Sequence, residues 1–211
     1  MTYSNCQNLT GSPVFGNKVN DIMQAYYNCR NLTGNPPICP PNVTSMHSTY
    51  TNCINLTGSP VCGSKITNMA HTYSNCRKIT GSPVCSTLTT GMYSTYNNCT
   101  SLTGSPVCGP NVTDLRNTYR SCMALIGPPV CGNNVISMDY TYFYCLSLTG
   151  SPVCGSNVTS MNNTYYWCVK LTGSPVCGNS VTNMAYTYFY CSNLTGSPVC
   201  GNKVTNMVNA Y

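Results

Sequence analysis

Cysteine is the residue type of this sequence with the most chemistry to offer. The chain holds 17 cysteines in 211 residues, a content typical of disulfide scaffolds. Disulfides need pairs, however, and 17 is odd. Zinc sites often use a C-x-x-C pair, and the sequence contains none. Disulfides, metal ligands and free thiols are therefore all to be weighed, and the spacing of the cysteines bears on the choice.

The cysteines form two regular series. The first holds Cys6, Cys29, Cys53, Cys76, Cys99, Cys122, Cys145, Cys168 and Cys191. The second holds Cys39, Cys62, Cys85, Cys108, Cys131, Cys154, Cys177 and Cys200, with Phe15 in the place before them. A position that accepts either Cys or Phe behaves as an apolar packing site, and free Cys is among the most buried residues. We expect buried free thiols, with some disulfides or a metal site as the alternatives.

Other catalytic or metal-binding groups are scarce. The only carboxylates are Asp21, Asp114 and Asp139, which share no pair spacing suited to general acid–base work. His47 and His71 share no common position in the regular spacing, so a metal site that uses them is not indicated. No nucleophile elbow, phosphate-binding glycine loop or H-E-x-x-H motif occurs. The sequence therefore predicts no enzyme, no catalytic residue, no cofactor and no metal.

The whole chain repeats with a period of 23 residues. The leucine of the recurring LTG word advances in steps of 23, and the one step of 24 falls where NPPIC (35–39) replaces SPVC. A 23-residue unit cannot bury its own apolar side, so it must stack on copies of itself. We therefore expect residues 1–211 to form a single solenoid of nine units, without evident capping repeats.

Two kinds of element are expected in each unit. Val158, Met161, Tyr165 and Cys168 are spaced by 3, 4 and 3 residues, which favours a short α- or 3₁₀-helical segment. The SPVCG word begins with Pro and ends with Gly, which favours a strand of three or four residues. The expected fold class is α/β, with short parallel strands on one face of the solenoid and short helical segments on the other.

These words resemble a known pattern. The stretch LTGSPVCGNKVTNM (194–207) is similar to the leucine-rich repeat L-x-x-L-x-L-x-x-N-x-L-x-x-L, with Ser197 in place of one leucine. The ending TYxNCxNL looks like that of BspA-like leucine-rich repeats, and VTNM resembles a related bacterial surface-protein repeat. The resemblance implies a leucine-rich-repeat solenoid and a surface binding or adhesion role in bacteria or protozoa. A virion surface protein would also suit it.

The direction of the side chains in the SPVC word is open. The leucine-rich-repeat frame favours Val inward and Cys outward, whereas Phe15 in the cysteine series favours an inward Cys. The rest of the core is expected to be a ladder of equivalent side chains. Its named members are Leu56, Leu102, Leu148, Leu171, Leu194, Met69, Met138, Met161, Met184, Cys76, Cys99, Cys145 and Cys168.

Aromatic residues crowd the C-terminal half of the chain, beside the expected helical segments. We expect a ligand patch there, although side chains that merely fill the outer face are the alternative. The patch residues are Tyr140, Tyr144, Tyr166, Trp167, Tyr186 and Tyr190.

Charge and hydropathy exclude some classes of partner. Only 6% of residues are charged and the net charge is +6. The bases form no stripe, so no nucleic-acid partner is predicted. There is no long apolar run for membrane insertion and no signal peptide at the start of the chain.

The sequence thus predicts a non-catalytic binding or adhesion module that contacts a protein or glycan on a host or neighbouring cell. Its location would be the cell surface, the extracellular space or a virion surface, as part of a larger protein. The first alternative is a structural protein that assembles end to end into a filament or virion component. The second is ordered-water binding through the threonines of the LTG words.

Overall fold

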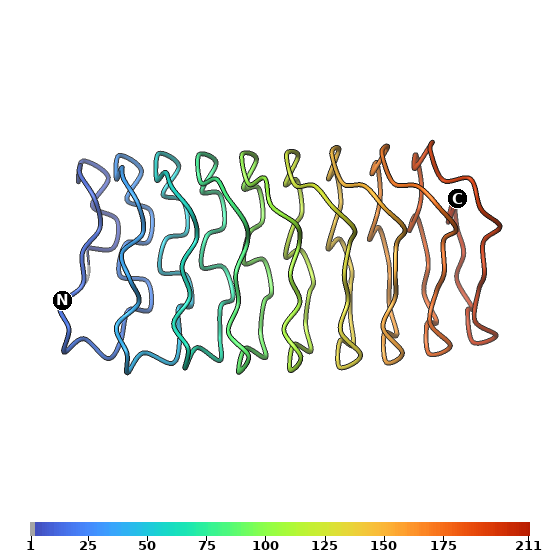
Figure 1. Ribbon diagram of the computed structural model, residues 1–211, viewed down its shortest axis with the longest axis horizontal. Helices are drawn as coiled ribbons and strands as arrows, with labels where there is room; N and C mark the ends of the chain where they lie inside the picture. The colour runs from blue at the N-terminus through green and yellow to red at the C-terminus, as the bar shows by residue number, and fades with distance from the viewer. Residues whose placement is uncertain (1–2) are drawn as a thin grey trace.

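The protein is a row of similar coils stacked side by side. The computed structural model describes residues 3–211, and Figure 1 shows the coils following one another from the blue N-terminal end to the red C-terminal end. One coil corresponds to one 23-residue unit, because backbone groups of residue i bond to groups 22 or 23 residues away. Equivalent residues of successive coils therefore lie above one another in columns.

Regular secondary structure is nearly absent. Between residues 3 and 211 there is no helix and no extended strand, only isolated parallel β-bridges between neighbouring coils. The bridges join Ser45 to Asn68, Asn68 to Gly91, Gly91 to Asp114, Asp114 to Ser137, Ser137 to Ser160, Ser160 to Asn183, Asn183 to Asn206, and Val176 to Val199. The predicted α/β leucine-rich-repeat fold is therefore wrong.

The segment expected to be helical bonds mainly between coils, and along itself it makes only isolated turns such as Thr164 to Met161. The amides of Met161, Asn163, Tyr165 and Trp167 donate to carbonyl oxygens of the next coil, each with an N···O distance of 2.9 Å. Asn163 and Trp167 have φ values of 55° and 61°, in the left-handed region. A left-handed residue at every fourth place prevents the i→i−4 bonds of an α-helix. It also turns the chain so that the 3, 4, 3 spacing still faces one side.

The SPVC word is not a strand in most coils. Its proline has no amide hydrogen to give to a ladder, and only Val176 and Val199 form a bridge there. The valine points outward, as in Val153, which is 55% exposed. The cysteine of the word packs against the core, as Cys154 does. The inward Val favoured by the leucine-rich-repeat frame is therefore wrong, and the Phe15 substitution indicated the direction correctly.

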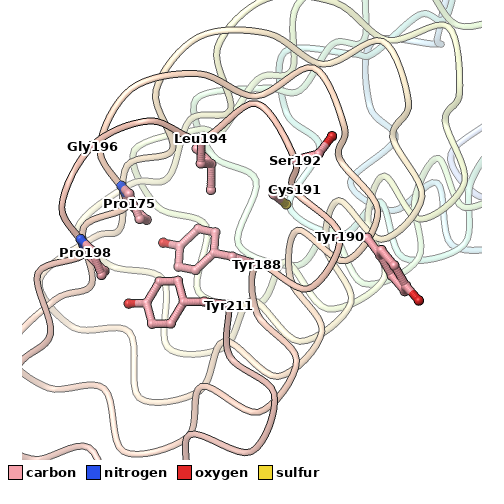
Figure 2. Close-up of a pocket in the computed structure, with 9 residues that line it drawn as sticks. All are labelled: Pro175, Tyr188, Tyr190, Cys191, Ser192, Leu194, Gly196, Pro198 and Tyr211. Carbon is pink, nitrogen blue, oxygen red and sulfur yellow. The ribbon is translucent and has the colours of Figure 1, made fainter.

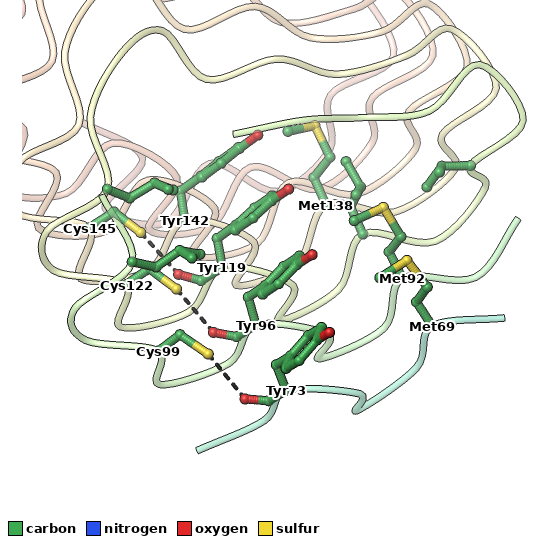
Figure 3. Packing of buried hydrophobic residues seen from close by; sticks show 14 of the residues in the cluster. Met69, Tyr73, Met92, Tyr96, Cys99, Tyr119, Cys122, Met138, Tyr142 and Cys145 are labelled. Carbon is green, nitrogen blue, oxygen red and sulfur yellow. Dashed lines mark hydrogen bonds between the residues drawn. The ribbon is translucent and has the colours of Figure 1, made fainter. Parts of the chain in front are cut away.

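Columns of identical side chains form the core. Figure 3 shows the tyrosine column, in which the rings of Tyr73, Tyr96, Tyr119 and Tyr142 are 5.6 Å apart and within 5° of parallel. All four are fully buried. Stacked aromatic pairs stabilise by about 0.5–1.5 kcal/mol each beyond the burial of their area. The column thus contributes to the stability of every coil.

Buried polar groups are satisfied by the backbone of neighbouring coils. The thiol of Cys99 donates to the carbonyl oxygen of Tyr73 in the preceding coil, with an Sγ···O distance of 3.0 Å. The hydroxyl of Thr187 lies 2.8 Å from the carbonyl oxygen of Met161 and 2.7 Å from that of Met184. Because an unpaired buried polar group costs about 1–3 kcal/mol, these bonds allow Cys and Thr to occupy the interior.

The 24-residue unit leaves a local defect. In seven other coils the hydroxyl of the column tyrosine donates to the valine carbonyl twelve residues earlier, as Tyr73 does to Val61 at 2.9 Å. The extra residue of NPPIC moves the equivalent Ile38 outward, where it is 89% exposed. The buried hydroxyl of Tyr50 consequently has no hydrogen-bond partner among the described residues.

Candidate binding face

Each coil carries two left-handed backbone positions that are four residues apart. We call them the first and second left-handed positions, as in His71 and Asn75, whose φ values are 57° and 63°. Asn tolerates this conformation better than other residues that carry a Cβ. Five successive coils have Asn at the second position, which we call the asparagine column: Asn5, Asn28, Asn52, Asn75 and Asn98.

Aromatic residues take these positions in the last three coils that have both. The second position is occupied by Tyr144, Trp167 and Tyr190, with φ values of 64°, 61° and 60°. We call this set the aromatic column. Tyr140 and Tyr186 occupy the first position, with φ values of 57° and 54°. A residue with a Cβ in the left-handed region is disfavoured by about 1–3 kcal/mol, so five bulky rings are held in a costly conformation.

The aromatic column is the centre of a continuous cluster on one face. Tyr144 stacks on Trp167 with ring centroids 5.1 Å apart, and Tyr190 meets Trp167 edge-on at 5.1 Å. Phe143 stacks on Tyr166 at 4.8 Å. The aromatic cluster comprises Tyr140, Phe143, Tyr144, Tyr166, Trp167, Tyr186, Phe189 and Tyr190.

An arginine borders the aromatic cluster. The guanidinium of Arg120 lies 5.0 Å from the ring centroid of Phe143 and 5.4 Å from that of Tyr140. Cation–π contacts at exposed sites stabilise by about 0.5–1 kcal/mol. The next cation along the face, Arg116, is already held by Asp114 through two hydrogen bonds of 3.0 and 2.7 Å. Arg120 therefore supplies the free positive charge at this edge.

The six predicted patch residues are all in this cluster. Tyr190 is 56% exposed and the others are half-buried, since each is flanked by rings of the same or neighbouring coils. Within the aromatic column Tyr144 and Trp167 cover each other's faces, so ring edges and hydroxyl groups remain for outside contacts. The sequence did not indicate Arg120, because its place on the face depends on the backbone path.

The predicted core ladder lies inside the stack. Twelve of its thirteen residues are fully buried, and Leu194 is half-buried in the last coil. The residues are Leu56, Leu102, Leu148, Leu171, Leu194, Met69, Met138, Met161, Met184, Cys76, Cys99, Cys145 and Cys168. These side chains support the faces of the solenoid from within and contact no outside partner.

All 17 cysteines are free thiols in the structure, and most are buried or half-buried. Burial raises the pKa of the Cys53, Cys122 and Cys191 thiols to about 12. Such thiols stay protonated at neutral pH and are poor nucleophiles and metal ligands. Among residues 3–211, no three side chains of His, Cys, Asp or Glu gather into a group that could hold a metal ion.

The two histidines do contact each other, although they occupy different positions in their units. Their rings are 5.9 Å apart, and His71 also meets Tyr93 edge-on at 4.9 Å. Burial, and then the neighbouring His47, lower the pKa of His71. The pair is therefore a packing contact between rings of neighbouring coils.

A cavity of about 320 Å³ opens at the last coil (Figure 2). Figure 2 shows Tyr188 and Tyr211 of the tyrosine column together with Pro175, Pro198 and Leu194. In inner coils the equivalent side chains are covered by the next coil. The cavity is therefore lined mainly by core positions, and it adds no group with chemistry of its own.

In the part of the chain that the structure describes, no helix has the length and hydrophobicity needed to cross a membrane. No known family model, no curated protein and no solved structure matches this chain.

Proposed function

We propose that the chain is a non-catalytic binding module that holds another protein through the aromatic cluster. The partner would be a protein on the surface of a cell or virion. Tyr, Trp and Arg are the residues that contribute most binding energy at protein interfaces. The aromatic cluster places all three types within one patch, with Arg120 at its border.

A single observation carries this proposal: the aromatic column occupies backbone positions that suit asparagine. Tyr144, Trp167 and Tyr190 hold φ values near 60°, as Asn52, Asn75 and Asn98 do. Residues kept in a disfavoured conformation are more frequent at functional sites than elsewhere. Binding of a partner would supply a gain that favours rings there over asparagine.

The surroundings of the carboxylates also support a non-catalytic role. Asp114 is paired with Arg116. Asp139 accepts hydrogen bonds from the Ser160 hydroxyl and the Asn162 amide. Asp21 accepts one from the Met23 amide at 2.9 Å. Each carboxylate is thus engaged in fixing the backbone or a neighbour, which leaves no paired acid and base for catalysis.

The proposal can be tested with a library of displayed peptides selected against the wild-type protein. The test variant is the triple change Tyr144→Asn, Trp167→Asn and Tyr190→Asn, which gives these coils the residue that other coils have. Relief of the left-handed strain and loss of ring contacts nearly offset each other. We therefore expect a folded variant whose unfolding free energy changes by less than about 1 kcal/mol per site.

Peptides selected on the wild type should lose at least about tenfold in affinity for the triple variant, since interface aromatics each contribute about 2 kcal/mol or more. The matched control is Met123→Thr, which removes an exposed apolar side chain of the same face outside the cluster. Peptides that bind the triple variant and the wild type equally would overturn the proposal.

Two other outcomes have distinct signatures. If wild-type protein sediments as oligomers and the triple variant as a monomer, the aromatic cluster is a contact between copies of this chain. If arrayed neutral glycans bind the wild type in place of peptides, the ligand class is wrong. Either result would replace the proposed protein partner.

A further inference from the structure

We propose a second site on this molecule, an anion-binding cleft that accepts the sulfate group of a sulfated glycan. The cleft is lined by Arg30, Asn52, Ile54, Asn75 and Arg77 and has a volume of about 290 Å³. We call it the arginine cleft. It goes beyond the aromatic cluster and shares no residue with it.

The stack brings the two arginines to the same column. Arg30 and Arg77 each follow the buried cysteine of their coil, and Ile54 holds the equivalent place in the coil between them. At the usual spacing between paired backbones, two coils correspond to about 10 Å. Two guanidinium groups thus flank a gap whose wall is the apolar side chain of Ile54.

The asparagines at the base of the cleft leave a donor available. In the asparagine column, Asn98 donates to Asn75 and Asn75 donates to Asn52, with N···O distances of 2.9 and 2.8 Å. This chain of bonds stops at Asn52. The equivalent oxygen of the preceding coil, Oδ1 of Asn28, accepts a hydrogen bond from Nε of Arg30 at 3.0 Å and none from Asn52. The Nδ2 group of Asn52 thus donates no hydrogen bond to another group among residues 3–211.

No acidic side chain neutralises the arginine cleft. The single ion pair among the described residues joins Arg116 to Asp114, in later coils. Asp139 is engaged by Ser160 and Asn162. Arg30 and Arg77 therefore form no ion pair, and together with Nδ2 of Asn52 they supply hydrogen-bond donors to the cleft. Guanidinium groups are well suited to oxyanions because their donors form a planar fork.

The chemistry of the cleft favours a sulfated glycan over a nucleic acid. Single-stranded nucleic acids are held by aromatic rings on which bases stack, and the cleft contains no ring. Tyr144 and Trp167 of the aromatic column lie in later coils and stack on each other. Amide groups of the asparagine column suit hydroxyl groups of a sugar, and Ile54 suits the apolar face of its ring.

The test measures binding of a heparin-derived hexasaccharide by titration calorimetry at low and at physiological salt. We expect the wild type to bind the sulfated hexasaccharide and not its desulfated form, with weaker binding at higher salt. Arg30→Gln and Arg77→Gln should each weaken binding about tenfold. The charge-matched control is Lys203→Gln in the last coil, which should change affinity less than about twofold.

The proposal is overturned if the double variant of Arg30 and Arg77 binds as tightly as the wild type, or if Lys203→Gln weakens binding equally. It is also overturned if a single-stranded DNA of equal charge binds more tightly through the same arginines. The triple variant of the aromatic column should bind the hexasaccharide normally. Failure of this site is thereby distinguished from failure of the protein-binding face.

Discussion

Asn75 and Trp167 occupy the same place in two coils of one molecule, with φ values of 63° and 61°. In the N-terminal half the place is held by a polar side chain that bonds to its copies above and below. In the C-terminal half it is held by rings that stack instead. The backbone is the same under both. The conformation is therefore imposed by the pairing of the coils and not chosen by the side chain.

A side chain at this position can stabilise the fold or serve contacts at the surface. Asparagine suits the left-handed backbone and adds a bond to its neighbour, so it serves the fold. Tyr and Trp are disfavoured on that backbone, and the contacts between their rings offset most of this cost. The core columns beneath are shared by both halves. The difference between the halves is thus confined to the surface, where partners would be met.

The largest expected effect concerns the shared core and comes with rising pH. Burial raises the pKa of Cys53, Cys122 and Cys191 from an ordinary value of 9.0 to about 12, and it raises the pKa of Tyr96 and Tyr142 well above their usual range. The unfolded chain loses these protons at lower pH than the folded one. Stability is therefore complete below about pH 9 and is lost as pH rises toward 12.

Because the thiol and tyrosine columns run under both halves, alkaline unfolding should be one concerted transition. Tyrosinate absorbance and tryptophan fluorescence of Trp167 would follow it from pH 8 to 12.5. Ionisation of all the tyrosines, those of the buried column included, while Trp167 fluorescence stays native would contradict the sealed core described above.

The second effect compares equal truncations in the two halves. Leu102→Ala lies beneath the polar surface and Leu171→Ala beneath the aromatic one, and both leucines are fully buried. Each change should reduce the unfolding free energy by about 2–5 kcal/mol, as for other large-to-small changes in cores. Guanidinium unfolding would measure both. Costs that differ by much more than 1 kcal/mol would show that the halves differ in their cores as well.

The smallest effect tests the surface position itself. Asn75→Tyr places a ring on the left-handed backbone without aromatic neighbours and removes two side-chain bonds, at a cost of about 2 kcal/mol. Asn75→Gly removes the same bonds but permits the conformation, so it should cost about half as much. Thermal unfolding of both variants would compare them. If the tyrosine variant is as stable as the glycine variant, the left-handed backbone at this position does not disfavour tyrosine.

The sequence predicts which side chains form buried columns, but it does not predict the backbone conformation that connects them. The period predicted which residues repeat, and Leu148, Met161 and Cys168 are indeed buried. The 3, 4, 3 spacing predicts a helix, because a helix buries residues at these intervals. The observed chain, with left-handed residues four apart, buries residues at the same intervals. The recurrent Asn before the buried Cys was the available clue to the left-handed backbone, but Trp167 and Tyr190 conceal it.

The candidate sites show the same division. The six patch residues could be named from composition, since aromatic residues crowd one half of the sequence. Arg120 at their border and the pairing of Arg30 with Arg77 could not, because both depend on which positions share a face. The bases form no stripe along the whole chain, since Arg30 and Lys65, for example, occupy different columns. Arg30 and Arg77 nevertheless occupy the same column.

The left-handed positions also affect the circular dichroism expected of this protein. Residues in left- and right-handed conformations contribute ellipticity of opposite sign, and each inner coil holds two or three left-handed residues. With neither helix nor extended strand between residues 3 and 211, the far-ultraviolet circular dichroism should be weak and resemble that of a denatured chain. The near-ultraviolet bands of the ordered tyrosines should be intense. The folded state would therefore be recognised by the signal of its side chains rather than by that of its peptide groups.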